Sequence, residues 1–173
     1  QGIHALFLHL IEQQEPQMAT WLHSQERRKP FTTSPLQGEF RRAGMELVVQ
    51  PDQAYWLRVT SVDTALSGVL MAIEDTPPAQ VRLFQVDFEV CAVTSHPHDH
   101  DWAGQSTYEQ LYSQAWQGRP LAQVTLEFAS PTVFRSQGRN LIMPSPRLVF
   151  SSLWESWHAF ASLPLPPDLL PLL

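Results

Sequence analysis

The order of hydrophobic patterns along this chain of 173 residues limits its fold more than any other feature. Apolar residues recur at helical spacing in three segments, which are residues 3–11, the stretch between Pro16 and Pro30, and residues 63–78. β-Branched or aromatic residues mark three extended segments, which are residues 31–36, 54–62 and 81–95. The first part of the chain therefore alternates helices with strands and is not all-helical or all-β.

A second series of patterns follows. Residues 106–118 are predicted to form a helix, because Ser106 and Glu109 have capping-box spacing and Gly118 can end it. A strand, a loop and an aromatic helix are predicted after it, at residues 121–134, 137–146 and 147–163. The two series have similar beginnings.

With one strand supplied before residue 1, the first series has the order βαββαβ, which is the ferredoxin-like arrangement. The second series begins in the same way and stops early. We therefore expect an α+β fold with an N-terminal ferredoxin-like domain over residues 1–118. Residues 119–173 are expected to begin a second such domain. On this interpretation the chain lacks the first strand of one domain and the C-terminal part of the other.

Charge limits the function classes. The net charge is −6, which argues against a broad electrostatic surface for nucleic acid. The basic residues are nevertheless clustered, and a local cluster can bind phosphate where the total charge is negative. The two clusters comprise Arg27, Arg28, Lys29, Arg41 and Arg42, and then Arg135, Arg139 and Arg147.

Composition also bears on location. No apolar run approaches the roughly 20 residues of a membrane span, and no signal peptide is visible, so we expect no membrane partner and a cytoplasmic protein. The single cysteine, Cys91, lies in an apolar run and is expected to be a buried thiol without a disulfide partner.

The segment "WLHSQERRKPFTTSPL" (residues 21–36) holds the best candidates for chemistry. His23 is followed by two arginines and by Lys29, the only lysine of the chain. His23 is either a structural residue at a helix end or a general acid/base among phosphate-binding cations. His4, on the preceding helix, can approach it in a helical hairpin, whereas His9 falls among apolar positions typical of a core or boundary residue.

Other histidines and aromatic residues have alternative explanations. The run "HPHDHD" (residues 96–101) is a metal candidate, but it lacks a second ligand cluster, so a surface loop is favoured over a metal site. His158 is expected to be structural, and Trp154 and Trp157 either stack on bases or belong to a core. No glycine-rich phosphate loop, nucleophile elbow or pair of catalytic carboxylates is present, so any chemistry depends on histidines and cations.

Two segments carry a family resemblance. "LHSQERRKPFTTSPL" and, later, "FASPTVFRSQGRNLIMPSPRLVFSSLWESW" resemble the CRISPR-associated endoribonucleases that process precursor CRISPR RNA, the sixth Cas family of the RAMP superfamily. The resemblance implies two tandem ferredoxin-like (RRM-like) domains that bind repeat RNA, with other Cas proteins or a fused domain as further partners. It also implies cleavage without metal or cofactor, which leaves a 2′,3′-cyclic phosphate and a 5′-hydroxyl.

By position, the resemblance assigns catalysis to His23, His4 and Lys29. The expected RNA-binding residues are Arg27, Arg28, Arg41, Arg42, Arg135 and Arg139. The alternative is a non-catalytic RAMP-type subunit that binds RNA in a processing or effector complex. Cleavage of RNA distinguishes the two.

Overall fold

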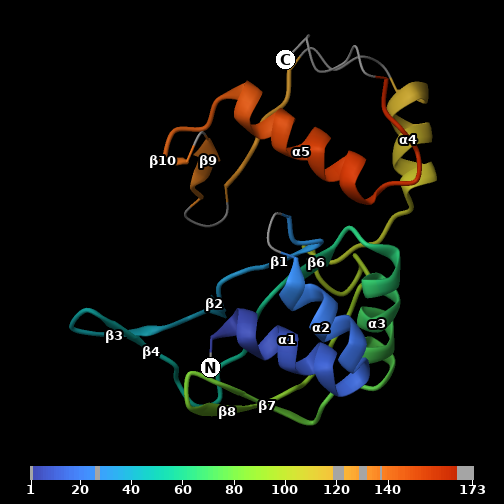
Figure 1. The fold of residues 1–173 in the computed structure, drawn as a ribbon. Helices are drawn as coiled ribbons and strands as arrows, with labels where there is room; N and C mark the ends of the chain where they lie inside the picture. Colours follow the sequence, from blue (N-terminus) through green and yellow to red (C-terminus); the bar gives the residue numbers. More distant parts are fainter. Residues whose placement is uncertain (1, 26–27, 119–122, 129–131, 137, 167–173) are drawn as a thin grey trace. The chain divides into compact units, whose positions relative to one another are not determined.

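A computed structural model describes residues 2–25, 28–118, 123–128, 132–136 and 138–166. Contacts between residues divide the chain into two units, residues 1–104 and residues 105–173, and each is described by itself. None of the described helices is long and apolar enough to cross a membrane. Figure 1 shows the helices and strands of both units.

Three helices build the core of the first unit. They are α1 (Ile3–Gln14), α2 (Pro16–Ser24) and α3 (Thr64–Asp75). The residue between the first two, Glu15, has φ −146°, outside the helical range, and Pro16 then starts α2 in its first turn. The Asp63 side chain accepts a hydrogen bond from the amide of Leu66 and caps α3. All three helices predicted for this part of the chain are therefore confirmed.

The core of the first unit gathers apolar side chains from four elements. α1, α2, α3 and strand β1 (Phe31–Thr33) contribute Phe7, Leu8, Ile11, Ala19, Leu22, Phe31, Leu66 and Ile73. Burial of each large side chain in such a cluster contributes about 1.5–3 kcal/mol. The core therefore fixes the end of α2 against the start of β1.

Residues 31–61 form one long antiparallel ribbon made of three successive pairs. From base to tip these pairs are β1 with β6 (Val59–Ser61), β2 (Gln37–Gly38) with β5 (Tyr55–Trp56), and β3 (Arg41–Ala43) with β4 (Glu46–Val48). Gly44, with φ +66°, makes the turn at the tip, a conformation that favours glycine. Both strand predictions in this region, over residues 31–36 and 54–62, are confirmed in shorter form.

The single long strand predicted over residues 81–95 is wrong. The chain instead turns back on itself, so that β7 (Gln80–Leu83) pairs with β8 (Val86–Glu89). Phe84 and Gln85 form the turn with φ +50° and +69°. Two-residue hairpin turns need positive φ, for which Asn-Gly is the usual signal, and Phe-Gln gives no such signal. Cys91 follows this hairpin and is exposed, contrary to the expected buried thiol.

The described residues of the second unit form two helices and one strand pair. Its elements are α4 (Tyr108–Gln117), β9 (Phe134–Ser136), β10 (Arg139–Leu141) and α5 (Pro146–Phe160). The capping box of α4 uses Thr107 and Gln110, one residue later than predicted, and Gly118 ends the helix as expected. The predicted strand over 121–134 is not observed in its described residues 123–128, and the predicted loop over 137–146 contains β10.

Candidate functional site

His23 lies in the last turn of α2, and its side chain is exposed. The neighbouring residue Leu22 is fully buried in the core of the first unit. The Ser24 hydroxyl donates a hydrogen bond of 2.7 Å to the carbonyl oxygen of Trp21 and closes the end of the helix. The core thus holds the backbone of His23, while the imidazole is left accessible.

The Lys29 ammonium binds the end of the same helix. It donates a hydrogen bond to the carbonyl oxygen of Leu22, and its side chain is half-buried. The last carbonyl groups of a helix have no partner within the helix and carry partial negative charge, so a cation at this position is favourable. The only lysine of the chain is therefore held beside the backbone of His23.

His4 approaches this segment from α1. Its ring stacks on Phe31 with 5.2 Å between centroids and 25° between planes, and Phe7 packs against the same phenyl ring at 4.5 Å. Phe31 follows Lys29 by two residues, so their Cα atoms are at most about 7 Å apart. His23 and Lys29 thus lie in the segment from Leu22 to Phe31, and His4 contacts this segment through the Phe31 ring. We name these three residues the histidine–lysine site.

The histidine–lysine site has the groups needed for proton transfer at a charged phosphate. The two imidazoles are exposed and come from different helices, and an imidazole can both take and give a proton near neutral pH. Lys29 supplies a fixed positive charge. Within the described part of the chain, no group of three or more His, Cys, Asp or Glu side chains is placed to hold a metal ion.

The predicted RNA-binding arginines are arranged in different ways. Arg41 and Arg42 are exposed on β3, near the tip of the ribbon, and as neighbours in a strand they point to opposite faces. Arg28 is half-buried and makes contacts of its own. Arg139 is exposed on β10 of the second unit. Arg27 and the side chain of Arg135 lie outside the described residues.

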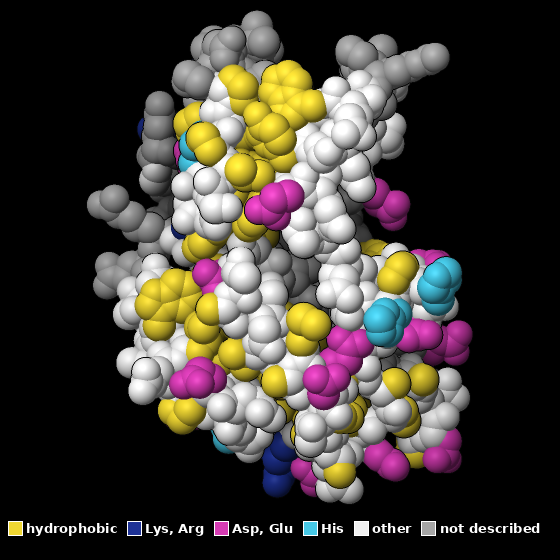
Figure 2. All heavy atoms as spheres, turned by 90° about the vertical axis from the view of Figure 1, so that its right-hand side faces the viewer, with side chains coloured by type: hydrophobic (Ala, Val, Ile, Leu, Met, Phe, Trp, Pro, Cys, Tyr) yellow, Lys and Arg dark blue, Asp and Glu magenta, His cyan; other side chains and the backbone are white. Residues whose placement is uncertain are grey.

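The "HPHDHD" run forms an ordered surface loop, and we name residues 94–102 the histidine loop. The Glu74 carboxylate on α3 accepts a hydrogen bond of 2.8 Å from the amide of Ser95. Hydrogen bonds from the backbone and hydroxyl of Ser95 lower the pKa of Glu74, and His96, at 4.0 Å, adds to this. On the face drawn in Figure 2, histidine side chains lie beside acidic ones. Sequence reasoning missed Glu74 as the anchor of this loop, because the pairing spans 21 residues.

Two further histidines can be compared with the expectations. His9 is exposed on α1, where it contacts Glu12 and Gln13, so the core or boundary prediction is wrong for it. His158 stacks on Trp154 with 3.8 Å between ring centroids and bonds to its carbonyl oxygen, as a structural residue does.

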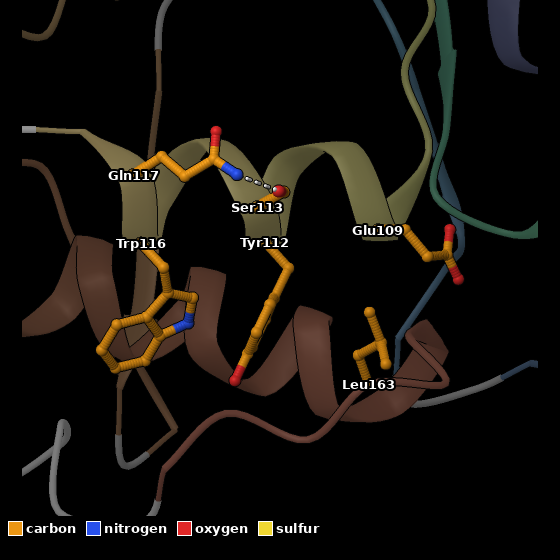
Figure 3. Close-up of a pocket in the computed structure, with 6 residues that line it drawn as sticks. All are labelled: Glu109, Tyr112, Ser113, Trp116, Gln117 and Leu163. Carbon is orange, nitrogen blue, oxygen red and sulfur yellow. Dashed lines mark hydrogen bonds between the residues drawn. The ribbon is translucent and has the colours of Figure 1, made fainter.

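The second unit also contains a shallow pocket of about 390 Å³. Figure 3 shows the rings of Tyr112 and Trp116 side by side along α4, with Leu163 near them and Gln117 bonded to Ser113. The lining, which also includes Glu109, has one carboxylate and neither a histidine nor a cation. The pocket therefore has no groups for the chemistry that the histidine–lysine site can support.

Comparison with known proteins identifies the family. Residues 1–113 match the CRISPR Cas6 N-terminal domain, and residues 126–169 match the CRISPR-associated endoribonuclease Cas6. The chain belongs to the Cas6 family. No curated protein sequence matches it significantly.

Solved Cas6 structures resemble this chain over almost its whole length. The product complex of Cas6 TTHA0078 has a TM-score of 0.68 at 29% identity and covers 98% of this chain and 60% of its own. The product complex of Cas6 TTHB231 has a TM-score of 0.71 at 29% identity, with 95% and 61% covered. A substrate mimic complex of TTHA0078 has a TM-score of 0.70 at 30% identity, with 98% and 60% covered.

The chain thus spans about 60% of the length of these Cas6 proteins. The agreement confirms the α+β class and the ferredoxin-like type of fold expected from the order of elements. It also confirms the family that the two sequence segments indicated.

Proposed function

We propose that this Cas6 protein is an endoribonuclease that cuts precursor CRISPR RNA within its repeats to give mature CRISPR RNA. The main support for the proposal is that His23 and Lys29 lie in one short segment, between the end of α2 and the start of β1, and that His4 stacks on Phe31 in the same segment. The family supports it, since the matched model is that of an endoribonuclease, and so do the similar Cas6 structures in product and substrate mimic complexes.

The proposed reaction is attack of a ribose 2′-hydroxyl on the adjacent phosphorus. One imidazole takes the proton of the 2′-hydroxyl as the new O–P bond forms. The other, protonated imidazole gives its proton to the 5′-oxygen as the bond from phosphorus to that oxygen breaks. The products are a 2′,3′-cyclic phosphate and a 5′-hydroxyl. His23 and His4 fill these two roles, in either order.

Lys29 has a double role in this proposal. Its charge beside His23 stabilises the extra negative charge of the pentacovalent phosphorane, together with Arg27 or Arg28. Its hydrogen bond to Leu22 also fixes the end of α2, which carries His23. Because the proton carriers and the cation come from the protein, we propose that the reaction needs neither a metal ion nor another cofactor.

Repeat RNA is the proposed partner, with Arg27, Arg28, Arg41, Arg42, Arg135 and Arg139 along its path. Other Cas proteins or a fused domain are further proposed partners, and the cytoplasm is the proposed location. We also retain the proposed domains, with an N-terminal ferredoxin-like domain over residues 1–118 and the beginning of a second over residues 119–173.

The decisive experiment incubates the complete protein with end-labelled repeat RNA in excess EDTA. We expect undiminished cleavage and a cyclic phosphate that phosphatase removes only after mild acid has opened it. RNA with a 2′-deoxy nucleotide at the cleaved position is the matched control and should stay intact. Loss of cleavage in EDTA, restored by Mg²⁺, would contradict the metal-free mechanism. Tight binding without any cleavage would favour the non-catalytic subunit.

A further inference from the structure

The base of the ribbon has one apolar face and one polar face. Phe31 is buried in the core, and side chains alternate along a strand, so Thr32 lies on the opposite face. Thr32 and Thr60 face each other in register, and their hydroxyl oxygens are 2.6 Å apart. Two residues further along each strand, the amide of Arg58 donates to the Ser34 hydroxyl at 2.8 Å. Hydroxyl groups and one guanidinium therefore line this polar face.

An aromatic group stands at the end of this face. The guanidinium carbon of Arg58 is 5.9 Å from the centroid of the Trp102 ring. Trp102 meets Trp56 edge to face, with 5.2 Å between centroids and 72° between planes. Although it makes both contacts, the Trp102 side chain stays 36% exposed. An indole beside a guanidinium, with surface left open to solvent, can bind another flat ring.

The histidine loop holds Trp102 in place. The amide of Trp102 donates a hydrogen bond of 3.0 Å to Nδ1 of His100, and the His100 ring packs on Trp56 at 4.6 Å. At the other end of the loop, Ser95 is bonded to Glu74 on α3. An aromatic side chain fixed in this way loses little conformational freedom when a ligand stacks on it.

We infer that Trp102 and Arg58, with the hydroxyls of Thr32 and Thr60, form a stacking subsite for an unpaired base of the bound RNA. This inference rests on the proposed function. Unpaired bases stack on aromatic side chains and on guanidinium planes, whichever base is present. Ser34, opposite Arg58, follows Phe31 by three residues, which is about 10 Å of strand. This length of strand, together with the opposite face of the ribbon from the Phe31 ring on which His4 stacks, separates the subsite from the histidine–lysine site. The stacked base therefore belongs to a nucleotide other than the cleaved one.

The charges around Trp102 favour a base over a phosphate. Asp101 precedes Trp102, and Asp99 lies in the same loop, where its carboxylate accepts a hydrogen bond from the Thr94 hydroxyl. These carboxylates repel phosphate. Arg58 lies on the other side, on the ribbon. The RNA backbone therefore follows the hydroxyl-lined ribbon, and the base turns toward the indole.

The test compares binding of repeat RNA by the complete protein and by Trp102→Leu, with the cleaved nucleotide replaced by its 2′-deoxy form. One stacked base contributes about 1–3 kcal/mol, so we expect the dissociation constant to rise about 5- to 150-fold. Trp102→Phe, which keeps a stacking ring, should restore most of the affinity. Trp116→Leu removes a tryptophan that is 60% exposed in the second unit, and it should bind like the wild type.

Abasic RNA separates stacking from damage to the loop. In a series of RNAs that each lack one base at a successive position, one should bind the wild-type protein as weakly as intact RNA binds Trp102→Leu. Trp102→Leu should bind that abasic RNA with the same affinity as the wild type does. Equal binding by the wild type and Trp102→Leu would overturn the subsite, as would an equal loss at every abasic position. In both cases, RNA cleavage that is lost in His23→Ala would still support the proposed endoribonuclease function. A wild-type protein without RNA binding would overturn both.

Discussion

The two units of this Cas6 chain differ in how they bury apolar side chains. Among the described residues, every side chain of the buried core lies in the first unit, where three helices and the ribbon enclose it. In the second unit the described helices and strands have no buried residue, and large apolar side chains such as Ile142, Met143 and Leu153 are 57–77% exposed. The histidine–lysine site is built on the unit that has its own core.

The two units also differ in how they hold a histidine near the end of a helix. His23 and His158 both lie in the last turn of a helix. His23 follows a fully buried leucine and lies beside a lysine held at the end of its helix. His158 bonds to its own helix and stacks on a neighbouring indole. Both side chains are exposed, but the ring of His158 already bonds to and stacks on Trp154 of its own helix.

The largest expected effect comes from replacing His23 of the histidine–lysine site with alanine. His23→Ala should slow single-turnover cleavage by about 10²- to 10⁴-fold, because a positioned acid/base contributes that much, while RNA affinity stays nearly unchanged. His4→Ala should fall between the wild type and His23→Ala. The matched control, His158→Ala, should cleave at the wild-type rate. Wild-type cleavage by His23→Ala would contradict the catalytic interpretation of the site.

A pair of leucines tests the comparison of the two units by stability. Leu22→Ala should lower the free energy of unfolding by about 2–5 kcal/mol, because it leaves a cavity in a fully packed core. Leu153→Ala, at a side chain that is 57% exposed, should change it by no more than about 0.5 kcal/mol. Denaturant unfolding of both variants measures this. A similar loss of unfolding free energy in both variants would mean that Leu153 on α5 is buried in the complete protein.

Arginines near the tip of the ribbon should affect binding more than cleavage. Arg41→Ala and Arg42→Ala remove exposed charges from opposite faces of β3. Each lost phosphate contact reduces the slope of log affinity against log salt by about 0.7 on single-stranded RNA. We expect this reduction in at least one of the two variants, measured by titrations at several salt concentrations. Wild-type slopes in both would place the RNA path away from the ribbon tip.

The sequence predicted local features better than distant pairings. The N-terminal ends of α2 and α3 follow from Pro16 and Asp63, which act within the first turn of each helix, and the sequence predicts both. The turn at Phe84 and Gln85 was missed because neither residue favours positive φ, and the pairing of β7 with β8 overrides that preference. Residues 123–128 alternate like a strand, yet the described structure gives them no pairing.

The sequence indicates the candidate residues of the site, whereas the contacts that hold them are seen only in the structure. His4, His23 and Lys29 could be named from residue types and spacing, but the carbonyl oxygen that binds Lys29 and the phenyl ring under His4 depend on tertiary packing. The same holds for Trp102 of the histidine loop, which lies 44 residues from Arg58, its partner on the ribbon. Sequence patterns report neighbours along an element, whereas these contacts join different elements.

The smallest expected effect concerns the anchor of the histidine loop. Glu74→Ala removes a carboxylate that accepts a hydrogen bond from Ser95, and it should destabilise the protein by on the order of 1 kcal/mol at neutral pH. Glu74→Gln keeps an oxygen that can accept this bond and should lose less. The folded state lowers the pKa of Glu74, so the stabilisation is present above the ordinary range of a glutamate. It is lost as the pH falls through the lowered pKa. Melting curves of the wild type and Glu74→Ala should therefore differ at neutral pH and converge in acid, and a difference that persists at low pH would show that packing, not charge, holds the loop.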